Sequence, residues 1–408
     1  MDEQELAFLN VALSVGDPRI ERRRLVGFYV LRECCRLEED EAWTPRLAFA
    51  RRELDAVAKE YPDDDRELRA LKELLGILDT ERIDRPALYS ALVRYGRELQ
   101  REGWDDFAPM VFEVAERSWT SDCLATDRLE LTYCHCMAVV RGAYAKHVKE
   151  EMPIVLAQRA RMARSREYLG AARVIELDRL LFAGNLSRGL RDAERLLAWI
   201  GRHPSTKVEA ATLVRIATVH GRAGRFEETV RYANRVLDTR FDAYARYSGL
   251  HLAGMAFMDL GDYAAAEAAF QLLLLAPNGV NRFLGWIGLL DLYARRGERE
   301  KFERIFERLA HLPFFAVARL NAFQAAGRGW AMLGETERAR VAFNTAHAIA
   351  EEYGYNYEII ETDDLLGSLD SAAAPPPIFP GDGIVPDAAA QVTAMRDAQA
   401  VEIAECLA

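Results

Sequence analysis

Apolar side chains recur along residues 247–277 at the spacing of two consecutive amphipathic helices. The first helix is expected to end at Gly261, and the second to begin at Asp262 and to end before Pro277. A glycine and an aspartate between two such helices predict a tight turn, and therefore an antiparallel pair of helices, or αα-hairpin. The apolar positions are Leu252, Gly254, Met255 and Phe257 in the first helix and Tyr263, Ala266, Phe270 and Leu273 in the second.

The same pattern recurs as seven pairs of small or apolar residues, with the members of each pair seven positions apart. The second members follow one another at intervals of 42, 39, 40, 37, 36 and 37 residues. A repeat of this length is typical of helical solenoids, in which each unit packs only on its neighbours. We therefore expect an all-α fold of about seven αα-hairpins. The pairs are Gly96/Gly103, Ala138/Ala145, Leu177/Gly184, Ala217/Gly224, Gly254/Gly261, Leu290/Gly297 and Gly327/Gly334.

Three units carry the fullest form of the pattern, in which the turn glycine is followed by alanine and phenylalanine on the second helix. This pattern resembles the tetratricopeptide repeat. The resemblance implies a right-handed αα-hairpin superhelix, a TPR-like solenoid, whose first helices line a concave face that binds proteins or peptides. It is weaker in the units at Ala217 and Leu290, and degenerate around Ala145 and Gly184. The three clearest units span residues 96–115, 247–277 and 327–346.

The chain is expected to divide into three parts. Residues 1–80 form an N-terminal helical cap or bundle, which is either a separate bundle or a set of eroded repeats, and residues 84–368 form the solenoid. Residues 369–408 begin with a linker rich in proline, glycine and alanine and end in a short helix. That helix either docks on the solenoid, binds another molecule or is disordered in isolation.

Three helices are expected within residues 1–80. Asp17 and Pro18 are the N-cap and first-turn residues of one, and residues 45–59 and 65–78 form the others. The basic run Arg22-Arg23-Arg24 is interpreted as a solvated helix face.

The charge balance argues against nucleic acid as the main partner. The formal net charge is −11 and the sequence pI about 5.4, whereas a phosphate backbone selects basic surfaces. A local basic stripe remains possible within an acidic whole.

The acidic start of the chain does not fit a signal peptide, and no apolar run approaches the roughly eighteen residues that cross a membrane. A cytoplasmic protein that binds no membrane is expected.

No catalytic motif is present in the sequence. Phosphate-binding loops, the zinc-protease motif and the nucleophile elbow are all absent, and the seven histidines are scattered. The Cys134-His135-Cys136 triplet lacks the second pair of ligands that structural zinc needs, so these cysteines are interpreted as buried helical residues. We therefore expect no enzymatic activity, no cofactor and no metal; an enzyme on a helical-repeat frame is the least favoured alternative.

The candidate binding site follows from the repeat, because certain positions of each first helix face inward. Arginines recur at these positions in an otherwise acidic chain, and two amides could bond the backbone of an extended peptide. Such a face suits a protein or peptide segment that carries carboxylates. Alternatively, Asp259 and Asp291 could pair with these arginines internally. The candidate partner-binding residues are Arg97, Arg101, Arg222, His251, Arg295, Asn321, Gln324 and Arg328.

The sequence favours a non-enzymatic scaffold or regulatory subunit that holds a partner along the concave face. The co-chaperone members of the tetratricopeptide family use a lysine and asparagine clamp, which this chain lacks: Asn321 is the sole inner asparagine and no lysine lies on the inner stripe. An alternative is a peptide-sensing regulator whose superhelix changes shape on binding, although residues 1–80 contain no convincing helix-turn-helix.

Overall fold

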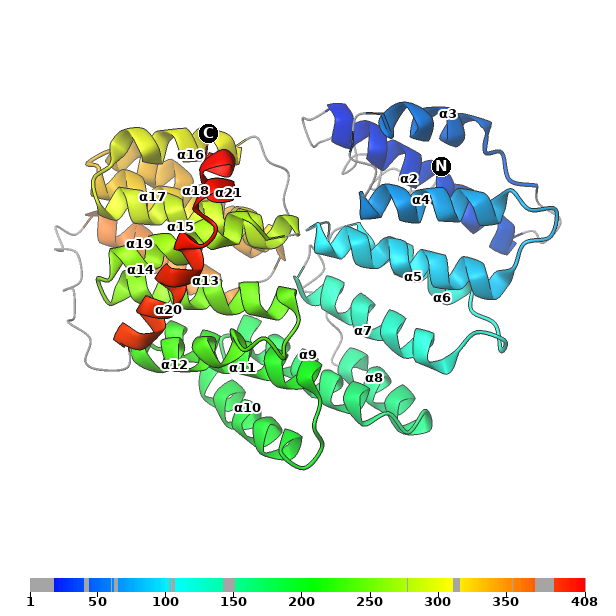
Figure 1. The fold of residues 1–408 in the computed structure, drawn as a ribbon, viewed down its shortest axis with the longest axis horizontal. Coiled ribbons are helices and arrows are strands. Elements are labelled where there is room, and N and C mark those ends of the chain that lie inside the picture. The colour runs from blue at the N-terminus through cyan, green and yellow to red at the C-terminus, as the bar shows by residue number, and fades with distance from the viewer. Residues whose placement is uncertain are drawn as a thin grey trace. The chain divides into compact units, whose positions relative to one another are not determined.

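The protein is all-α in its computed structural model, as the sequence predicted. Across the described residues there are twenty helices and no strand (Figure 1). The helices fall into two compact units, α2–α7 and α8–α21. The three-part division expected from the sequence stays a prediction. The structure describes residues 18–39, 44–59, 61, 65–102, 104, 107–141, 151–276, 278–310, 316–353, 355–370 and 385–407.

The first unit consists of helices that pack mainly on their neighbours in the chain, α2 on α3, α4 on α5, α5 on α6 and α6 on α7. The predicted helix at residues 65–78 is confirmed, with the Asp65 side chain as N-cap accepting a hydrogen bond from the Leu68 N–H (2.9 Å). The bounds are α2 (Pro18–Glu39), α3 (Ala48–Val57), α4 (Arg66–Leu78), α5 (Arg85–Arg101), α6 (Ala108–Arg117) and α7 (Ala125–Arg141).

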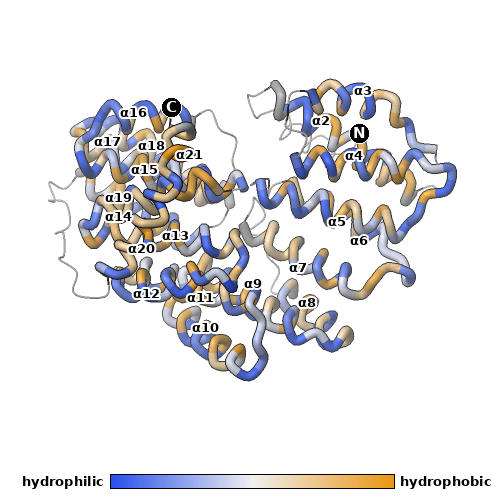
Figure 2. Tube along the Cα trace, in the orientation of Figure 1, coloured by the Kyte–Doolittle hydropathy of each residue, from blue (hydrophilic) through white to orange (hydrophobic). Residues whose placement is uncertain are grey.

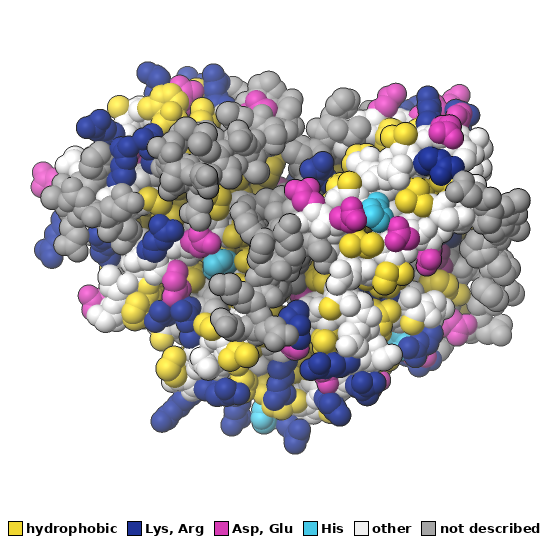
Figure 3. Space-filling view, turned by 180° about the vertical axis from the view of Figure 1, so that it is seen from behind, with side chains coloured by type: hydrophobic (Ala, Val, Ile, Leu, Met, Phe, Trp, Pro, Cys, Tyr) yellow, Lys and Arg dark blue, Asp and Glu magenta, His cyan; other side chains and the backbone are white. Residues whose placement is uncertain are grey.

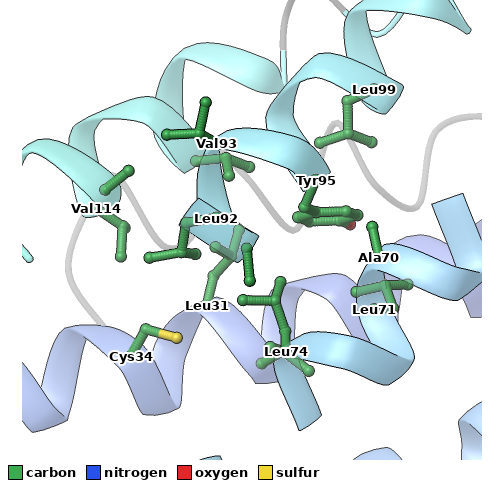
Figure 4. Close-up of a cluster of buried hydrophobic side chains, with 14 of the residues drawn as sticks. Leu31, Cys34, Ala70, Leu71, Leu74, Leu92, Val93, Tyr95, Leu99 and Val114 are labelled. Atoms are coloured by element: carbon green, nitrogen blue, oxygen red, sulfur yellow. The ribbon is translucent and has the colours of Figure 1, made fainter. Parts of the chain in front are cut away.

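The core of this unit is formed by the apolar faces of its helices. Leu31 of α2, Leu71 and Leu74 of α4 and Leu92 of α5 belong to one buried cluster (Figure 4). Hydrophilic and hydrophobic residues alternate along most helices, as amphipathic packing requires (Figure 2). Cys134 and Cys136 are buried on α7, which confirms their interpretation as buried helical cysteines.

The interpretation of Arg22-Arg23-Arg24 as a solvated face is wrong for two of the three residues. The Arg23 side chain is 8% exposed and that of Arg24 is fully buried. Glu67 lies between them, 2.5 Å from Arg24 and 3.0 Å from Arg23. The guanidinium of Arg24 also lies 4.0 Å from the ring centroid of Trp104. The sequence pattern of α2 alone could not reveal this, because the partner carboxylate comes from α4.

The second unit contains pairs of antiparallel helices in the predicted order, and from α8 to α19 each helix packs on the next. α15 lies at the centre of the packing and is buried along most of its length. The bounds are α8 (Glu151–Met162), α9 (Arg166–Phe182), α10 (Leu186–Ile200), α11 (Thr206–Arg222), α12 (Phe226–Val236), α13 (Ala243–Asp259), α14 (Tyr263–Leu274), α15 (Gly279–Arg295), α16 (Arg299–Ala310), α17 (Ala316–Met332), α18 (Thr336–Tyr353), α19 (Asn356–Asp370), α20 (Val385–Asp397) and α21 (Ala400–Leu407).

The turn between α13 and α14 has the geometry that the sequence predicted. Gly261 has φ 83°, in the left-handed region that favours glycine, and the N–H of Asp262 donates to the Phe257 carbonyl (2.9 Å). Asp262 then caps α14 by accepting from the Ala265 N–H (3.0 Å). The turn glycines predicted in four further units also have positive φ, whereas Gly103 and Ala145 lie outside the described residues. These four are Gly184, Gly224, Gly297 and Gly334.

Aromatic rings fill the space above the small residues of the first helices. Phe270 of α14 is fully buried and packs between Gly254 of α13 and Gly288 of α15. A Cβ atom would lie 2.7 Å from the Phe270 ring at Gly254 and 2.3 Å from it at Gly288. The glycines therefore allow the three helices to approach closely, as the repeat pattern predicted for Gly254.

The C-terminal helices pack on the second unit, which settles the choice left open by the sequence. α20 contacts α12, α13 and α14, and α21 contacts α14. In Figure 1 they are the red helices that cross this unit. Val392 of α20 is fully buried, and an Arg308 N–H of α16 donates to the Cys406 carbonyl (3.3 Å). The linker before α20 lies outside the described residues.

Candidate functional site

Six helices of the second unit contact one another in a closed circuit. We call α9, α11, α13, α15, α17 and α19 the inner helices. Each contacts the next in this order, and α19 in turn contacts α9. Helices α11, α13, α15 and α17 carry the predicted site residues of this unit. The circuit determines which of these residues meet.

Arg295 and Arg328 converge on one buried carboxylate. Nη2 of Arg328 donates to Oδ2 of Asp291 (3.3 Å), while Nε of Arg295 lies 3.7 Å from Oδ1. Nη2 of Arg295 also lies 2.8 Å from Oδ1 of Asp259. The Asp291 side chain is 1% exposed and both arginines are 22% exposed. The internal pairing that the sequence left open is therefore present.

The charges in this cluster depend on each other. Burial disfavours the charged form of Arg295 and so lowers its pKa. The negative charges of Asp291 and Asp259 outweigh this effect, and the pKa of Arg295 is raised. Burial raises the pKa of Asp259, against the opposing effect of Arg295. Oδ1 of Asp291 and Nε of Arg295 make no hydrogen bond with any described residue. Both atoms are buried, and they lie 3.7 Å apart as an ion pair without a hydrogen bond.

Arg222 joins α11 to α19. Its Nη2 donates to Oε1 of Glu358 (2.5 Å), its Nη1 to the Leu181 carbonyl (3.1 Å), and its guanidinium lies 4.1 Å from the ring centroid of Tyr357. Glu358 is 2% exposed. Burial raises the pKa of Glu358, and Arg222 opposes this shift. Arg222 thus holds a carboxylate that is 136 residues away in sequence.

Gln324 also contacts α19. Its amide Nε2 donates to the hydroxyl of Thr362 (2.9 Å), and this hydroxyl donates to the Glu358 carbonyl (2.6 Å). The rings of Phe182 and Tyr355 lie 5.4 Å apart and add an apolar contact. Two predicted site residues, one arginine and one amide, therefore bind an acidic helix of the same chain.

The sequence interpretation did not identify an ion pair between α9 and α11, nor the partners of Arg222 and Gln324 on α19. Asp178 of α9 and Arg215 of α11 form a bidentate ion pair. Nε of Arg215 donates to Oδ1 of Asp178 (2.8 Å), and Nη2 donates to Oδ2 (2.6 Å). Asp178 and Arg215 are 37 positions apart, as are Asp291 and Arg328. Acidic and basic residues one repeat apart were the signal that could have revealed these pairs. Gln324 and Thr362 are also about one repeat apart, at 38 positions, whereas no such spacing identifies Glu358 as the partner of Arg222.

His251 and Asn321 are half-buried and form no hydrogen bond with the described residues through their side chains. Burial lowers the pKa of His251 to about 4, so its imidazole is neutral at physiological pH. A neutral imidazole carries one donor and one acceptor. Both residues therefore retain the capacity for hydrogen bonding that the sequence interpretation assigned to them.

Arg97 and Arg101 lie on α5 in the first unit, apart from the other six predicted residues. Arg97 Nη1 is 3.5 Å from Oε1 of Glu130, and Arg101 donates to Glu98 (2.6 Å). Both arginine side chains are about two-fifths exposed (39% and 40%). Of the eight predicted residues, the structure thus brings Arg295 and Arg328 together at Asp291, and Arg222 and Gln324 together on α19.

The stability of the second unit is expected to fall between pH 6.5 and 4. In this range the unfolded chain binds a proton at His251 that the folded chain rejects, so lower pH favours unfolding. The full effect is about 3 kcal/mol, and it is absent above pH 6.5, where the residue is neutral in both states. Urea unfolding at several pH values measures it. His251→Gln should flatten the curve, and an unchanged pH dependence in this variant would contradict the assignment.

Within the described ranges, no helix is long and apolar enough to span a bilayer. No group of three or more His, Cys, Asp or Glu side chains there is arranged to hold a metal ion.

Neither a scan against protein-family models nor a search of curated proteins returns a match. Inferences about function therefore depend on the geometry.

Proposed function

We propose that this chain is a non-enzymatic helical-repeat protein of the tetratricopeptide type, which binds an acidic segment of a partner protein on its inner helices. The proposal is supported by the turn glycines with positive φ and by the rings of Phe270 and Phe343 above Gly254 and Gly327. These are the features on which the resemblance depends, and such repeats commonly present extended binding surfaces.

The observation that carries the proposal is the contact between Arg222 and Glu358. A guanidinium and an amide of the inner helices, Arg222 and Gln324, contact successive turns of α19 through Glu358 and Thr362. α19 has a tyrosine, Tyr357, in its first turn and carries five carboxylates, so it has the composition of an acidic amphipathic segment. A partner segment with similar chemistry would use the same donors and would replace α19.

Opposite changes are expected from two conservative substitutions. Glu358→Gln weakens the hold of Arg222 on α19 and should raise the amount of partner captured, because α19 competes with the partner. Arg222→Gln removes the donor that both occupants need and should lower capture about tenfold. The measurement is affinity capture by the full chain with quantitative mass spectrometry, with circular dichroism to verify helicity.

Asp364→Asn is the matched control, since Asp364 is an exposed carboxylate on the same helix. It should leave capture unchanged. If Glu358→Gln and Arg222→Gln shift capture in the same direction, or by no more than Asp364→Asn, the inner helices are not the binding surface.

A peptide-sensing regulator is the second candidate, and the position of α19 favours it. α19 closes the circuit of inner helices by contacting both α9 and α17. Displacement of α19 by a ligand would open the circuit and change the shape of the unit. Small-angle scattering with and without a captured partner tests this idea, and an unchanged radius of gyration would favour the simple scaffold.

A further inference from the structure

A group of arginines on the second unit has no carboxylate partner. Arg164, Arg166, Arg173 and Arg202 are all exposed, and none forms an ion pair with a described residue. Elsewhere most arginines of this unit are paired, as Arg215 is with Asp178. Lys and Arg side chains gather along the lower edge of the molecule in Figure 3, where Figure 1 places α8–α10. We call these four residues the arginine surface.

Three of the four arginines, Arg166, Arg173 and Arg202, share one neighbourhood, and Arg164 lies two positions before Arg166 in the chain. The guanidinium of Arg173 lies 4.9 Å from the ring centroid of Trp199, and the ring of His203 lies 4.7 Å from that of Trp199. Burial, followed by the charges of Arg166, Arg202 and Arg173, lowers the pKa of His203. Three of the arginines therefore act on the same imidazole.

Aromatic rings contact two cations beside this surface. Arg173 lies over Trp199, and Lys207 lies 5.1 Å from the ring centroid of Tyr168. A guanidinium stacked on a ring keeps its N–H edge free for a forked contact with a carboxylate. α9 and α11 also begin here, after the N-caps Ser165 and Ser205, and helix N-termini add positive potential. One carboxylate, Glu167, accepts from the Ser205 hydroxyl (3.5 Å).

Arg164 occupies a backbone position that disfavours it. Its φ is 52°, and it is the sole described residue other than glycine with positive φ. Its turn has the same hydrogen bonds as the glycine turns, since Ser165 donates to the Ala160 carbonyl (2.8 Å) as Asn185 does to Leu180 (2.9 Å). Glycine would satisfy this turn without strain. An arginine in this strained position, two residues before Arg166 in the chain, points to a role for its side chain.

We infer that the arginine surface binds an acidic segment of another protein through that segment's carboxylates. This surface is distinct from the inner helices of the proposed function. A protein segment fits better than nucleic acid because the chain as a whole carries a net charge of −11. A long polyanion would extend beyond the arginine surface and be repelled by the negative charge of the rest of the chain. A short acidic segment would place its carboxylates on the arginine surface alone.

The test uses the full chain and a fluorescein-labelled oligoglutamate peptide, with fluorescence anisotropy at low salt. The variant Arg166→Gln/Arg173→Gln/Arg202→Gln should weaken binding about tenfold. The control Arg188→Gln/Arg195→Gln/Arg231→Gln removes the same charge from exposed arginines that are paired with Asp192 or Glu228. It should leave the Kd within about twofold.

Equal weakening in the two triple variants would overturn the inference, because net charge would then explain binding. Tighter binding of oligothymidylate than of oligoglutamate would also overturn it, in favour of nucleic acid. If Arg222→Gln weakens oligoglutamate binding and the arginine-surface triple variant does not, the peptide binds the inner helices and this inference is overturned. If only the arginine-surface triple variant weakens it, this inference stands whatever the outcome for the inner-helix proposal.

Arg164→Gly separates stability from binding. It should raise the melting temperature of the second unit by about 2–4 °C, because it relieves the strained turn. The same variant should weaken oligoglutamate binding about twofold. A higher melting temperature with unchanged binding would overturn the assignment of Arg164 to this surface.

Discussion

Replacing Glu67 with leucine is expected to destabilise the first unit by about 3–5 kcal/mol, because a buried guanidinium loses its carboxylate. The Arg24 side chain is 0% exposed and that of Glu67 1%. Burial lowers the pKa of Arg24, and Glu67 provides the strongest opposing charge. Two nitrogens of Arg24 already lack a hydrogen-bond partner among the described residues. Native-state hydrogen exchange of the α2 and α4 amides measures the change.

Two further variants make this result specific. Glu73→Leu, on the same helix, breaks an exposed ion pair with Arg94 and should change stability by less than about 1 kcal/mol. Arg24→Met combined with Glu67→Leu removes both buried charges and should recover much of the loss, while Arg23 keeps Asp65 at 3.1 Å. If Glu67→Leu costs no more than Glu73→Leu, the buried pair does not contribute as described.

Phe270→Ala is expected to destabilise the second unit by about 3–5 kcal/mol, because the ring fills the space between α13 and α15. The Phe270 ring is fully buried against Gly254 and Gly288. Chemical denaturation followed by circular dichroism measures the loss. Phe306 is the matched control, because it occupies the same position of the next repeat, sixteen residues after Leu290 as Phe270 is after Gly254, but is half-buried. Phe306→Ala should cost clearly less.

Gly288→Ala tests the same contact from the other side. Its methyl group would lie 2.3 Å from atoms of the Phe270 ring, so the substitution should cost about 1–3 kcal/mol. In the double variant Phe270→Ala/Gly288→Ala the missing ring leaves room for the methyl group. The stability lost by the double variant should therefore be smaller than the sum of the losses in the two single variants. Fully additive losses would show that Phe270 and Gly288 are not energetically coupled.

Local patterns in the sequence predicted the hairpins because their determinants lie close together along the chain. Gly261 is followed at once by the N-cap Asp262, and Phe270 lies sixteen positions after Gly254, so one repeat holds both partners. The inner ion pairs of Asp291 with Arg328 and of Asp178 with Arg215 were also accessible in principle. Their partners are separated by one repeat length, 37 residues.

The burial of Arg24 and the role of α19 could not be predicted in this way. Glu67 is 43 residues from Arg24 on a helix outside the repeat, and Glu358 is 136 residues from Arg222. Neither separation follows from the spacing of apolar residues on one helix. Both pairs exist because distant helices pack side by side, and that packing depends on the sum of many contacts.

The sequence by itself determined the all-α class and the hairpin turns, because these depend on spacing within one or two helices. The tertiary structure alone decided what the predicted site residues touch. It brought α19 against α9, paired Arg222 with Glu358, and placed Arg173 over the ring of Trp199. The physical reason is that a charged side chain is stabilised by whichever group is near it in space, and nearness over long separations is set by packing.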